Sequence, residues 1–278
     1  MSVGASRAYL RRAIGSGVIA LVAVTLPASP FAQPAQDAVW LWAGVPPSQV
    51  PDGARTVYVY QGEIVERAGA VDVVRRGLHP IGGDTRAIVP AVRFRGQPAP
   101  ATVARHFEAL AAAWEARGRS VPMVQIDWDV PSRHVGAHAD FVASVRTALD
   151  RRYALSVTGL ADWIVASPRA DLLRLAGAAD EIVFQLYHDR HEVPGIARYD
   201  TALAAFERPF KVGLLPGMAL PPRASRSANW RGSVTFLLKE RTVRDASTGP
   251  GESVPVVRAG ARFSETLRTR SLRQAWLR

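Results

Sequence analysis

Residues 123–129 read Met-Val-Gln-Ile-Asp-Trp-Asp, a short β-favouring run that ends in two acids. Side chains along a strand point alternately to its two faces. Gln125, Asp127 and Asp129 therefore share one face, while the apolar residues between them share the other. An otherwise apolar strand with two acids and a glutamine on one face is costly to bury unless those groups have partners or a task.

Seven other β-rich runs flank this one, and helix-like stretches separate the middle runs. The eight runs lie at residues 39–43, 56–60, 87–94, 123–129, 154–160, 181–187, 210–215 and 233–238. With Val92, Ile126, Val157, Phe184 and Val212 as strand markers, the successive steps are 34, 31, 27 and 28 residues. A parallel βαβ unit needs about 30 residues. We therefore predict an α/β fold, a TIM-type (β/α)8 barrel, with an open doubly wound sheet as the alternative. The alternative fold would normally carry a glycine-rich phosphate turn after its first strand, and residues 44–47, Gly-Val-Pro-Pro, do not fit one.

The boundaries of the barrel follow from composition. The barrel domain is expected to span residues 36–220. Residues 221–278 contain adjacent prolines and many Arg, Ser and Thr, so we expect a basic, irregular and incomplete end to the barrel there.

The N-terminal residues resemble a secretory signal. Arg7, Arg11 and Arg12 precede an apolar run of about 14 residues, and small residues and prolines follow. This pattern predicts a signal peptide over residues 1–35, cleaved between residues 28 and 35, and a periplasmic or extracellular protein. The run is shorter than the ~20 residues of a membrane span, and no later segment suits one, so we expect no stable membrane span after cleavage. An uncleaved anchor is the alternative.

The net charge of +11 would suit a nucleic-acid binder, but the charge lies at the two ends of the chain. Residues 1–35 carry three arginines and no acid, and residues 223–278 carry an excess of eight positive charges, so residues 36–222 are neutral. A neutral body does not attract polyanions, and we expect no nucleic-acid partner. The absence of cysteine from the sequence excludes a disulfide scaffold, a thiolate metal site and a cysteine nucleophile.

The two acids of the central run are the candidate catalytic residues. In a TIM-type barrel, catalysis takes place at the C-terminal ends of the strands, where Asp127 and Asp129 are expected. Two neighbouring carboxylates repel each other, and burial raises the pKa of at least one, which keeps an acid protonated near neutral pH. We predict Asp129 as the general acid, beside an ionised Asp127. The alternative is a structural pair that caps the next helix or binds Arg133.

The next two β-rich runs end in side chains that can contact a sugar. Gln185 and Tyr187 share a face, and an amide and a phenol are suited to holding hydroxyl or acetamido groups. Asp162 and Trp163 follow the fifth run, where an aromatic ring at the rim would stack on a pyranose. With Gln125, these are the predicted substrate-contacting residues. An ordinary buried Tyr187 and a core-packing Trp163 are the alternatives.

The histidines do not define a metal site. His134 and His138 are four residues apart, and His188 and His191 lie near two acids, but no spacing fixes a third ligand. We interpret them as solvated loop histidines and expect no metal. The sequence also contains no serine nucleophile elbow and no phosphate-binding loop, so we expect no cofactor.

Several of these segments resemble known families. Residues 126–131, Ile-Asp-Trp-Asp-Val-Pro, are similar to the end of the D-x-x-D-x-D-x-E motif of family-18 glycoside hydrolases, and Gln-Leu-Tyr at 185–187 is similar to their M-x-Y. The chain also resembles the bacterial domain of unknown function 3142, which is expected to be a glycosidase-like barrel. The segments of this second resemblance lie at residues 37–42, 57–64, 125–129, 155–163 and 180–187, within a match from about residue 37 to 217.

The family-18 resemblance implies roles for three residues. Asp129 falls on the acid, Asp127 on the carboxylate that steadies the acetamido group of the substrate, and Tyr187 on the tyrosine that holds the acetamido oxygen. The chain departs from the motif in two ways. Pro122 and Gln125 stand where the motif has its first two acids, and Asp129 is one methylene shorter than the family's Glu. A shortfall of about 1 Å costs on the order of 10²-fold in rate.

Three functions remain as hypotheses. The leading one is an exported glycosidase-like enzyme whose partner is a carbohydrate, either a polysaccharide or a cell-wall glycan. The first alternative is a non-catalytic sugar-binding module on the same barrel. The second is an envelope-interaction protein that docks its basic tail on anionic polymers. The sequence leaves the sugar, the linkage and the oligomeric state open.

Overall fold

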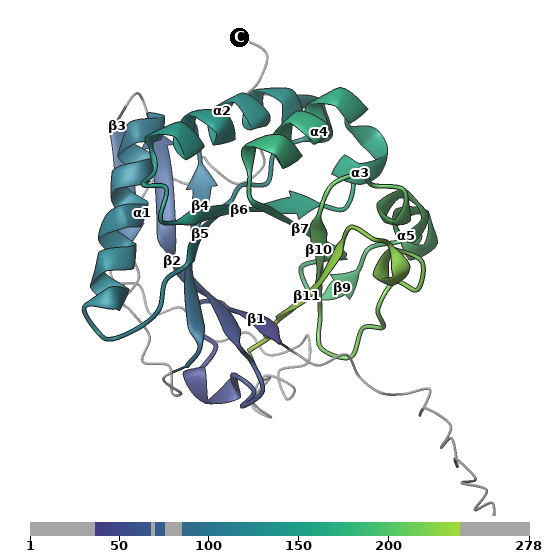
Figure 1. Cartoon of the computed structure of the whole chain (residues 1–278), viewed down its shortest axis with the longest axis horizontal. Coiled ribbons are helices and arrows are strands. Elements are labelled where there is room, and N and C mark those ends of the chain that lie inside the picture. The colour runs from purple at the N-terminus through teal and green to yellow at the C-terminus, as the bar shows by residue number, and fades with distance from the viewer. Residues whose placement is uncertain (1–36, 68–69, 76–84, 240–278) are drawn as a thin grey trace, which may run out of the picture.

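The computed structural model describes residues 37–67, 70–75 and 85–239. Eight parallel strands form a closed TIM-type (β/α)8 barrel, seen nearly end-on in Figure 1. The strands are β1 (Ala38–Leu41), β2 (Thr56–Arg67), β4 (Ala87–Arg95), β5 (Met123–Asp127), β6 (Ala154–Leu160), β7 (Glu181–Gln185), β10 (Phe210–Leu214) and β11 (Trp230–Phe236). The ring closes because β1 pairs in parallel with both β2 and β11. The predicted barrel is confirmed.

The helices lie outside the ring of strands (Figure 1). They are α1 (Pro100–Glu115), α2 (Val135–Ala148), α3 (Trp163–Ala166), α4 (Arg169–Ala178) and α5 (Ile196–Ala204), with short 3-10 turns η1 (Pro47–Gln49), η2 (Ser132–His134) and η3 (Ala224–Arg226). Helix α1 begins at a proline, whose fixed φ suits the first helical position. Its buried stripe, which includes Val103, Phe107 and Trp114, packs in the same core as Val92 and Ile126 of the barrel wall.

Strands of a parallel barrel are buried on both faces, and the apolar residues accordingly form two clusters. The larger cluster joins the outer face of the strands to the helices. The smaller one fills the interior, and its buried members are Ala38, Trp40, Tyr58, Val89, Val183, Tyr187, Leu215 and Val234. The barrel is therefore a packed core and not a pore.

Trp40 crosses the interior of the barrel from β1. Its indole Nε1 donates a hydrogen bond to Gln125 Oε1 at 2.7 Å. The ring has room because β10 carries glycine at position 213, where a Cβ would lie 2.5 Å from Trp40 Cζ3. Real Cβ atoms essentially never make so short a contact, so a side chain at Gly213 would force the indole to move.

A polar network fills the N-terminal end of the barrel interior. Glu181 Oε1 accepts hydrogen bonds from Tyr58 Oη at 2.7 Å and from Ser156 Oγ at 2.8 Å. Its other oxygen lies 2.7 Å from Lys211 Nζ. Both charged groups of this ion pair therefore have hydrogen-bond partners, which a buried ion pair requires to be tolerated. This end of the barrel is therefore occupied by structural contacts.

Two hairpins add to the barrel at its C-terminal end. Strand β3 (Ala70–Arg75) pairs antiparallel with the second half of β2. Strands β8 (Tyr187–His188) and β9 (His191–Glu192) form a small separate sheet directly after β7. A register shift between Tyr60 and Glu63 in the pairing of β2 with β4 marks a bulge, where Gly62 has φ +127°.

The boundary expected at residue 220 is too early. Strand β11 supplies the eighth wall of the barrel, so the domain continues at least to Phe236. The expected signal peptide at residues 1–35 and the part of the basic tail from residue 240 onward lie outside the described residues. Within the described ranges, no helix is both long and apolar enough to span a bilayer.

Candidate functional site

Asp127 is the last residue of β5 and lies inside the C-terminal end of the barrel. Its Oδ2 atom accepts a hydrogen bond from Arg93 Nε at 2.8 Å, and its Oδ1 atom accepts one from Thr158 Oγ1 at 2.8 Å. The residue is only 1% exposed. A buried carboxylate needs a cation and further hydrogen bonds, and Asp127 has both. Strands β4 and β6, which flank β5, therefore hold this carboxylate in place.

Asp129 follows β5 by two residues and is exposed, although the surrounding barrel mouth removes part of its hydration. Burial within the barrel mouth, and then the negative charge of Asp127, raise the pKa of Asp129 to about 6. Arg93 and His188 act in the opposite direction but do not cancel these two effects. A carboxyl group with this pKa is partly protonated near neutral pH, which is what a general acid requires.

Tyr187 lies beside both carboxylates. It is the first residue of β8 and only 8% exposed. Burial, and then the charges of Asp127 and Asp129, raise its pKa well above the ordinary range, so the phenol stays neutral. Among the described residues, its hydroxyl has no hydrogen-bond partner. A neutral, unpaired phenol beside two acids can hold one polar group of a ligand.

A group of aromatic rings lies beside Arg93 and Tyr187. The Arg93 guanidinium lies over the ring of Trp42, 5.1 Å from its centroid. Trp42 stacks on Tyr60 at 4.4 Å, and Phe236 of β11 lies 5.8 Å from Trp42 and 5.3 Å from Tyr187. The residue after β1 and residues of β2, β8 and β11 therefore form one aromatic group beside Arg93. The Arg93 cation is attracted to the face of Trp42, which helps to fix its position beside Asp127.

Arg93 and Thr158 are the residues that the sequence analysis missed. Both lie within strands that were predicted, at residues 87–94 and 154–160. An arginine within an otherwise apolar strand needs an acidic partner, and the two acids of the next strand need a cation. These opposite charges on neighbouring strands were the signal for an ion pair in the sequence. Only the strand register, in which Arg93 pairs with Asp127, shows which acid is the partner.

Part of this barrel matches a known family. Residues 84–208 match the family described as Domain of unknown function (DUF3142). The DUF3142 segment contains β4 to β9, α1 to α5 and both carboxylates, and it confirms the predicted resemblance over that range. No curated protein matches the chain. Among solved structures, the chitinase domain of the spore coat protein CotE from Clostridium difficile aligns with a TM-score of 0.38 and 14% identity, over 62% of this chain and 63% of that chain.

The two predicted glutamines of the DUF3142 segment differ in their surroundings. Gln125 is 0% exposed, accepts from Trp40 and donates from Nε2 to Ser156 Oγ at 3.0 Å. The predicted substrate contact of Gln125 is therefore wrong, because both ends of its amide bind core residues. Gln185 ends β7 at the same end of the barrel as Asp127 and is half-buried.

Trp163 does not lie at the rim, where stacking on a pyranose was predicted. It is 0% exposed, begins α3 and donates from Nε1 to the Val130 carbonyl at 2.8 Å. Core packing, the alternative reading, describes it correctly. Asp162 is exposed, but it accepts a hydrogen bond from Tyr199 Oη at 2.6 Å and pairs with Arg198 at 3.2 Å. Asp162 therefore joins the start of α3 to α5 within the DUF3142 segment.

The histidines are also arranged differently from the expectation. His138 lies on α2, is 2% exposed and packs edge-on against Trp128 and Trp163, with ring centroids at 5.2 and 5.5 Å. It is not a solvated loop histidine, since burial lowers its pKa to about 4. His188 is exposed in the hairpin after β7. Across the described residues, no three His, Cys, Asp or Glu side chains group in a way that could hold a metal ion.

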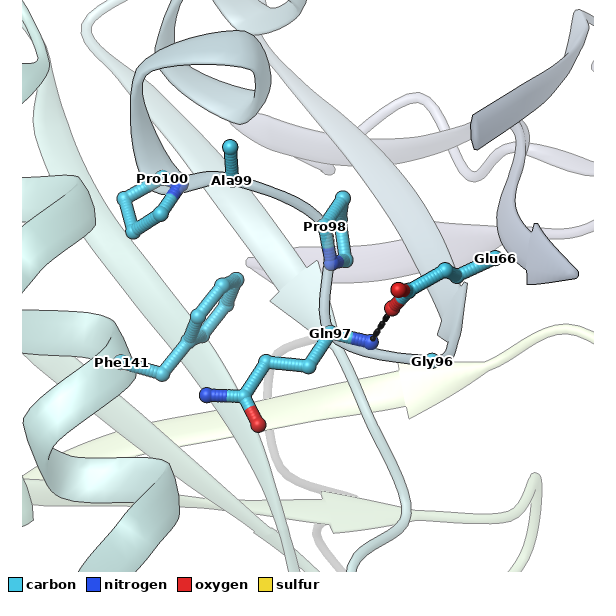
Figure 2. A pocket seen from close by; sticks show the side chains of 7 residues that line it. All are labelled: Glu66, Gly96, Gln97, Pro98, Ala99, Pro100 and Phe141. Atoms are coloured by element: carbon cyan, nitrogen blue, oxygen red, sulfur yellow. Dashed lines mark hydrogen bonds between the residues drawn. The ribbon is translucent and has the colours of Figure 1, made fainter. Parts of the chain in front are cut away.

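A separate hollow of about 480 Å³ lies beside the loop that joins β4 to α1. Figure 2 shows Gln97 and the two prolines of that loop bordering it, with Phe141 reaching in from α2. Its one carboxylate, Glu66, accepts a hydrogen bond from the Gln97 backbone N–H at 2.9 Å. Neither Asp127 nor Asp129 lines this hollow, so the acids at the barrel mouth remain the candidate catalytic site.

Proposed function

We propose that this protein is an exported glycoside hydrolase that cleaves a polysaccharide or a cell-wall glycan, with Asp129 as its general acid. The observation that carries the proposal is the difference between the two acids. Asp127 is fixed in an ion pair, whereas the pKa of Asp129 is raised to about 6. A fixed carboxylate beside a carboxyl group of raised pKa is the usual basis of acid and base assignments in glycosidases.

The proposed reaction begins with a proton transfer. Protonated Asp129 gives its proton to the glycosidic oxygen as the bond from that oxygen to the anomeric carbon breaks, and the leaving sugar departs as an alcohol. The positive charge that develops on the anomeric carbon is stabilised by the Asp127 carboxylate. Water then adds to the anomeric carbon, and its proton returns to the Asp129 carboxylate, which restores the enzyme.

An N-acetyl sugar would suit Tyr187. The acetamido oxygen of the substrate can itself attack the anomeric carbon, so no second protein nucleophile is needed. The neutral Tyr187 hydroxyl, which has no partner among the described residues, is placed to donate to that oxygen. N-acetyl groups are therefore the substrate feature that we expect the site to favour.

A non-catalytic sugar-binding module is the second candidate function. It is favoured by the short side chain of Asp129, which reaches less far than Glu, and by the ion pair that partly neutralises Asp127. Both functions share the same ligand class and the same residues. They differ only in whether the glycosidic bond breaks.

Turnover and binding of Asp129→Asn separate the two functions. Wild type is first screened on a glycan array, and the retained glycan is then assayed for reducing ends and for binding. The enzyme hypothesis predicts a loss of turnover of about 10²-fold or more with binding retained. Asp140→Asn is the matched control, because it changes an exposed acid on the outer face of α2. Full activity of Asp129→Asn would show that another group supplies the proton.

Export is a separate part of the proposal. It rests on the basic and apolar pattern of residues 1–35 alone. N-terminal sequencing of secreted material should give a start between residues 29 and 36. A start at Met1 or Ser2 would contradict cleavage. Salt-sensitive binding that is lost on deletion of residues 240–278 would instead favour the envelope-interaction alternative.

A further inference from the structure

Strands β2 and β4 continue beyond the end of β5. The pairing of β4 with β5 ends where Arg93 meets Asp127, but β4 continues to Arg95 and β2 to Arg67. Strand β3 pairs along the outer edge of this extension. The three strands therefore form a wall that continues the barrel sheet past the site of the two acids, visible at the upper left of Figure 1.

One lateral row of side chains runs from the barrel interior onto this wall. In the strand registers Asp127 pairs with Arg93, Arg93 with Glu63, and Glu63 with Val74. Paired residues of neighbouring strands project from the same face of a sheet. With strands about 4.8 Å apart, the row covers about 14 Å from the buried acid to β3. The inward face of the barrel and the open face of the wall are thus one continuous surface.

The row and the neighbouring Arg95 of β4 together carry balanced charges. Arg93 pairs with Asp127, and Arg95 donates from Nε to Glu63 Oε2 at 2.9 Å, while Tyr60 Oη donates to Glu63 Oε1 at 3.1 Å. The Arg95 side chain remains 60% exposed. An exposed ion pair of this kind contributes little to stability, so stability alone does not account for it.

Val74 ends the row with an apolar group. It is 43% exposed, and of the described residues only Val165 is another large apolar side chain with comparable exposure. The wall therefore presents planar hydrogen-bonding groups followed by an apolar contact. A polyanion would find no net positive charge here, whereas a neutral chain with hydroxyl edges and C–H faces matches both features.

We propose that this wall is a second carbohydrate subsite, which binds sugar units further along the chain than the unit held at Asp129. The inference rests on the proposed function, because it assumes that a glycan occupies the barrel mouth. Arg95 and Glu63 hold hydroxyl groups, and Val74 contacts an apolar sugar face. Only a ligand of several units reaches from the two acids to β3.

The test compares short and long members of one oligosaccharide series. Wild type is screened against chitin, peptidoglycan, cellulose and xylan oligomers, and the dissociation constants of the disaccharide and the hexasaccharide of the bound series are then measured. We expect Arg95→Ala to weaken hexasaccharide binding about tenfold, or about 1.4 kcal/mol, with the disaccharide changed less than about twofold. Arg105→Ala is the matched control, since Arg105 is exposed on α1 and contacts Thr102 of its own helix. Val74→Ser tests the apolar end of the row independently.

Each other outcome overturns the inference in a recognisable way. Equal binding of both lengths by Arg95→Ala and Arg105→Ala would remove the subsite and leave the proposed function intact. A wild type that binds no member of any series would overturn the proposed function and the subsite together. Unchanged hexasaccharide binding by Arg95→Ala together with a lower free energy of unfolding would show that the Arg95–Glu63 pair serves the fold and not a ligand.

Discussion

Arg93 and Asp127 are register partners on neighbouring strands, and the guanidinium Nε lies 2.8 Å from the carboxylate Oδ2. Because Arg93 binds only Asp127, the two acids at the barrel mouth have different environments. Asp127 is held by the cation on β4 and by Thr158 on β6, so its negative charge is fixed in position. Asp129 faces that charge without a comparable partner among the described residues, and burial and Asp127 together raise its pKa to about 6.

Removal of Arg93 should destabilise the barrel more than removal of its neighbour Arg95. Arg93→Gln leaves Asp127 buried without a cation, and we expect the free energy of unfolding to fall by about 3 kcal/mol. Arg95→Gln breaks an exposed pair and should cost less than about 1 kcal/mol. Urea unfolding of both variants measures the difference. Adding Asp127→Asn to Arg93→Gln should recover part of the loss, and equal costs for the two arginine variants would contradict the assignment.

Asp129→Asn should change how stability depends on pH. The folded-state pKa of Asp129 is raised, so the folded protein binds the proton more tightly than the unfolded chain. Its contribution to stability is present at low pH and is lost as pH rises from about 4 through about 6. The Asn variant lacks this loss, and above pH 6 it should be at least as stable as wild type. Thermal unfolding of both proteins across this range checks the sign, and parallel curves would mean that the Asp129 pKa is not raised.

His138→Phe should stabilise the protein and make it more tolerant of acid. His138 is buried with both ring nitrogens unpaired among the described residues, and burial lowers its pKa to about 4. Because the folded pKa is depressed, wild type loses stability as pH falls from about 6.5 to about 4. Phenylalanine fits the surrounding aromatic cluster and should add about 1 kcal/mol to the free energy of unfolding at neutral pH. A stability loss at pH 7 would indicate a partner for the imidazole.

Two glycine substitutions should have opposite effects. A Cβ at Gly213 would lie 2.5 Å from Trp40, so Gly213→Ala should cost about 3 kcal/mol by displacing an indole that also binds Gln125. Gly177, inside α4, has nothing within 4 Å of the added Cβ. Gly177→Ala should therefore gain about 0.5–1 kcal/mol from helix propensity. Denaturant midpoints give both values, and a neutral Gly213→Ala would mean that the interior repacks freely.

The barrel could be predicted because its signals are local. Each strand shows as a short β-rich run, and the repeat of about 30 residues per βαβ unit fixes parallel order. The one misplaced boundary, residue 220, left the run at residues 233–238 outside the barrel, because the composition around that run is basic and proline-rich. Trp230–Phe236 contains polar residues and a glycine, and its membership in the barrel is decided by pairing with β10 and β1.

The site was less predictable, because its contacts depend on residues distant in the chain. Alternation correctly placed Gln125 and Asp127 on one face, but it could not show that Trp40 reaches across the barrel to occupy Gln125. Trp163 follows a strand end, as a rim residue would, yet α3 turns it toward His138 and the core. Periodicity identifies which face a residue occupies, while its partner depends on the register and on the path of the next helix.

The pairing of β1 with β11 gives the barrel a particular order of assembly during synthesis. The first strand of the described chain leaves the ribosome early, but one of its two neighbours is the last strand of the ring. Such a contact between distant segments is slow to form, and until it does, β1 and β10 each present an unpaired edge. A chain that stopped near residue 220 would not be a smaller barrel. It would be an open sheet with two unpaired edge strands, and we expect it to associate with other copies through those edges.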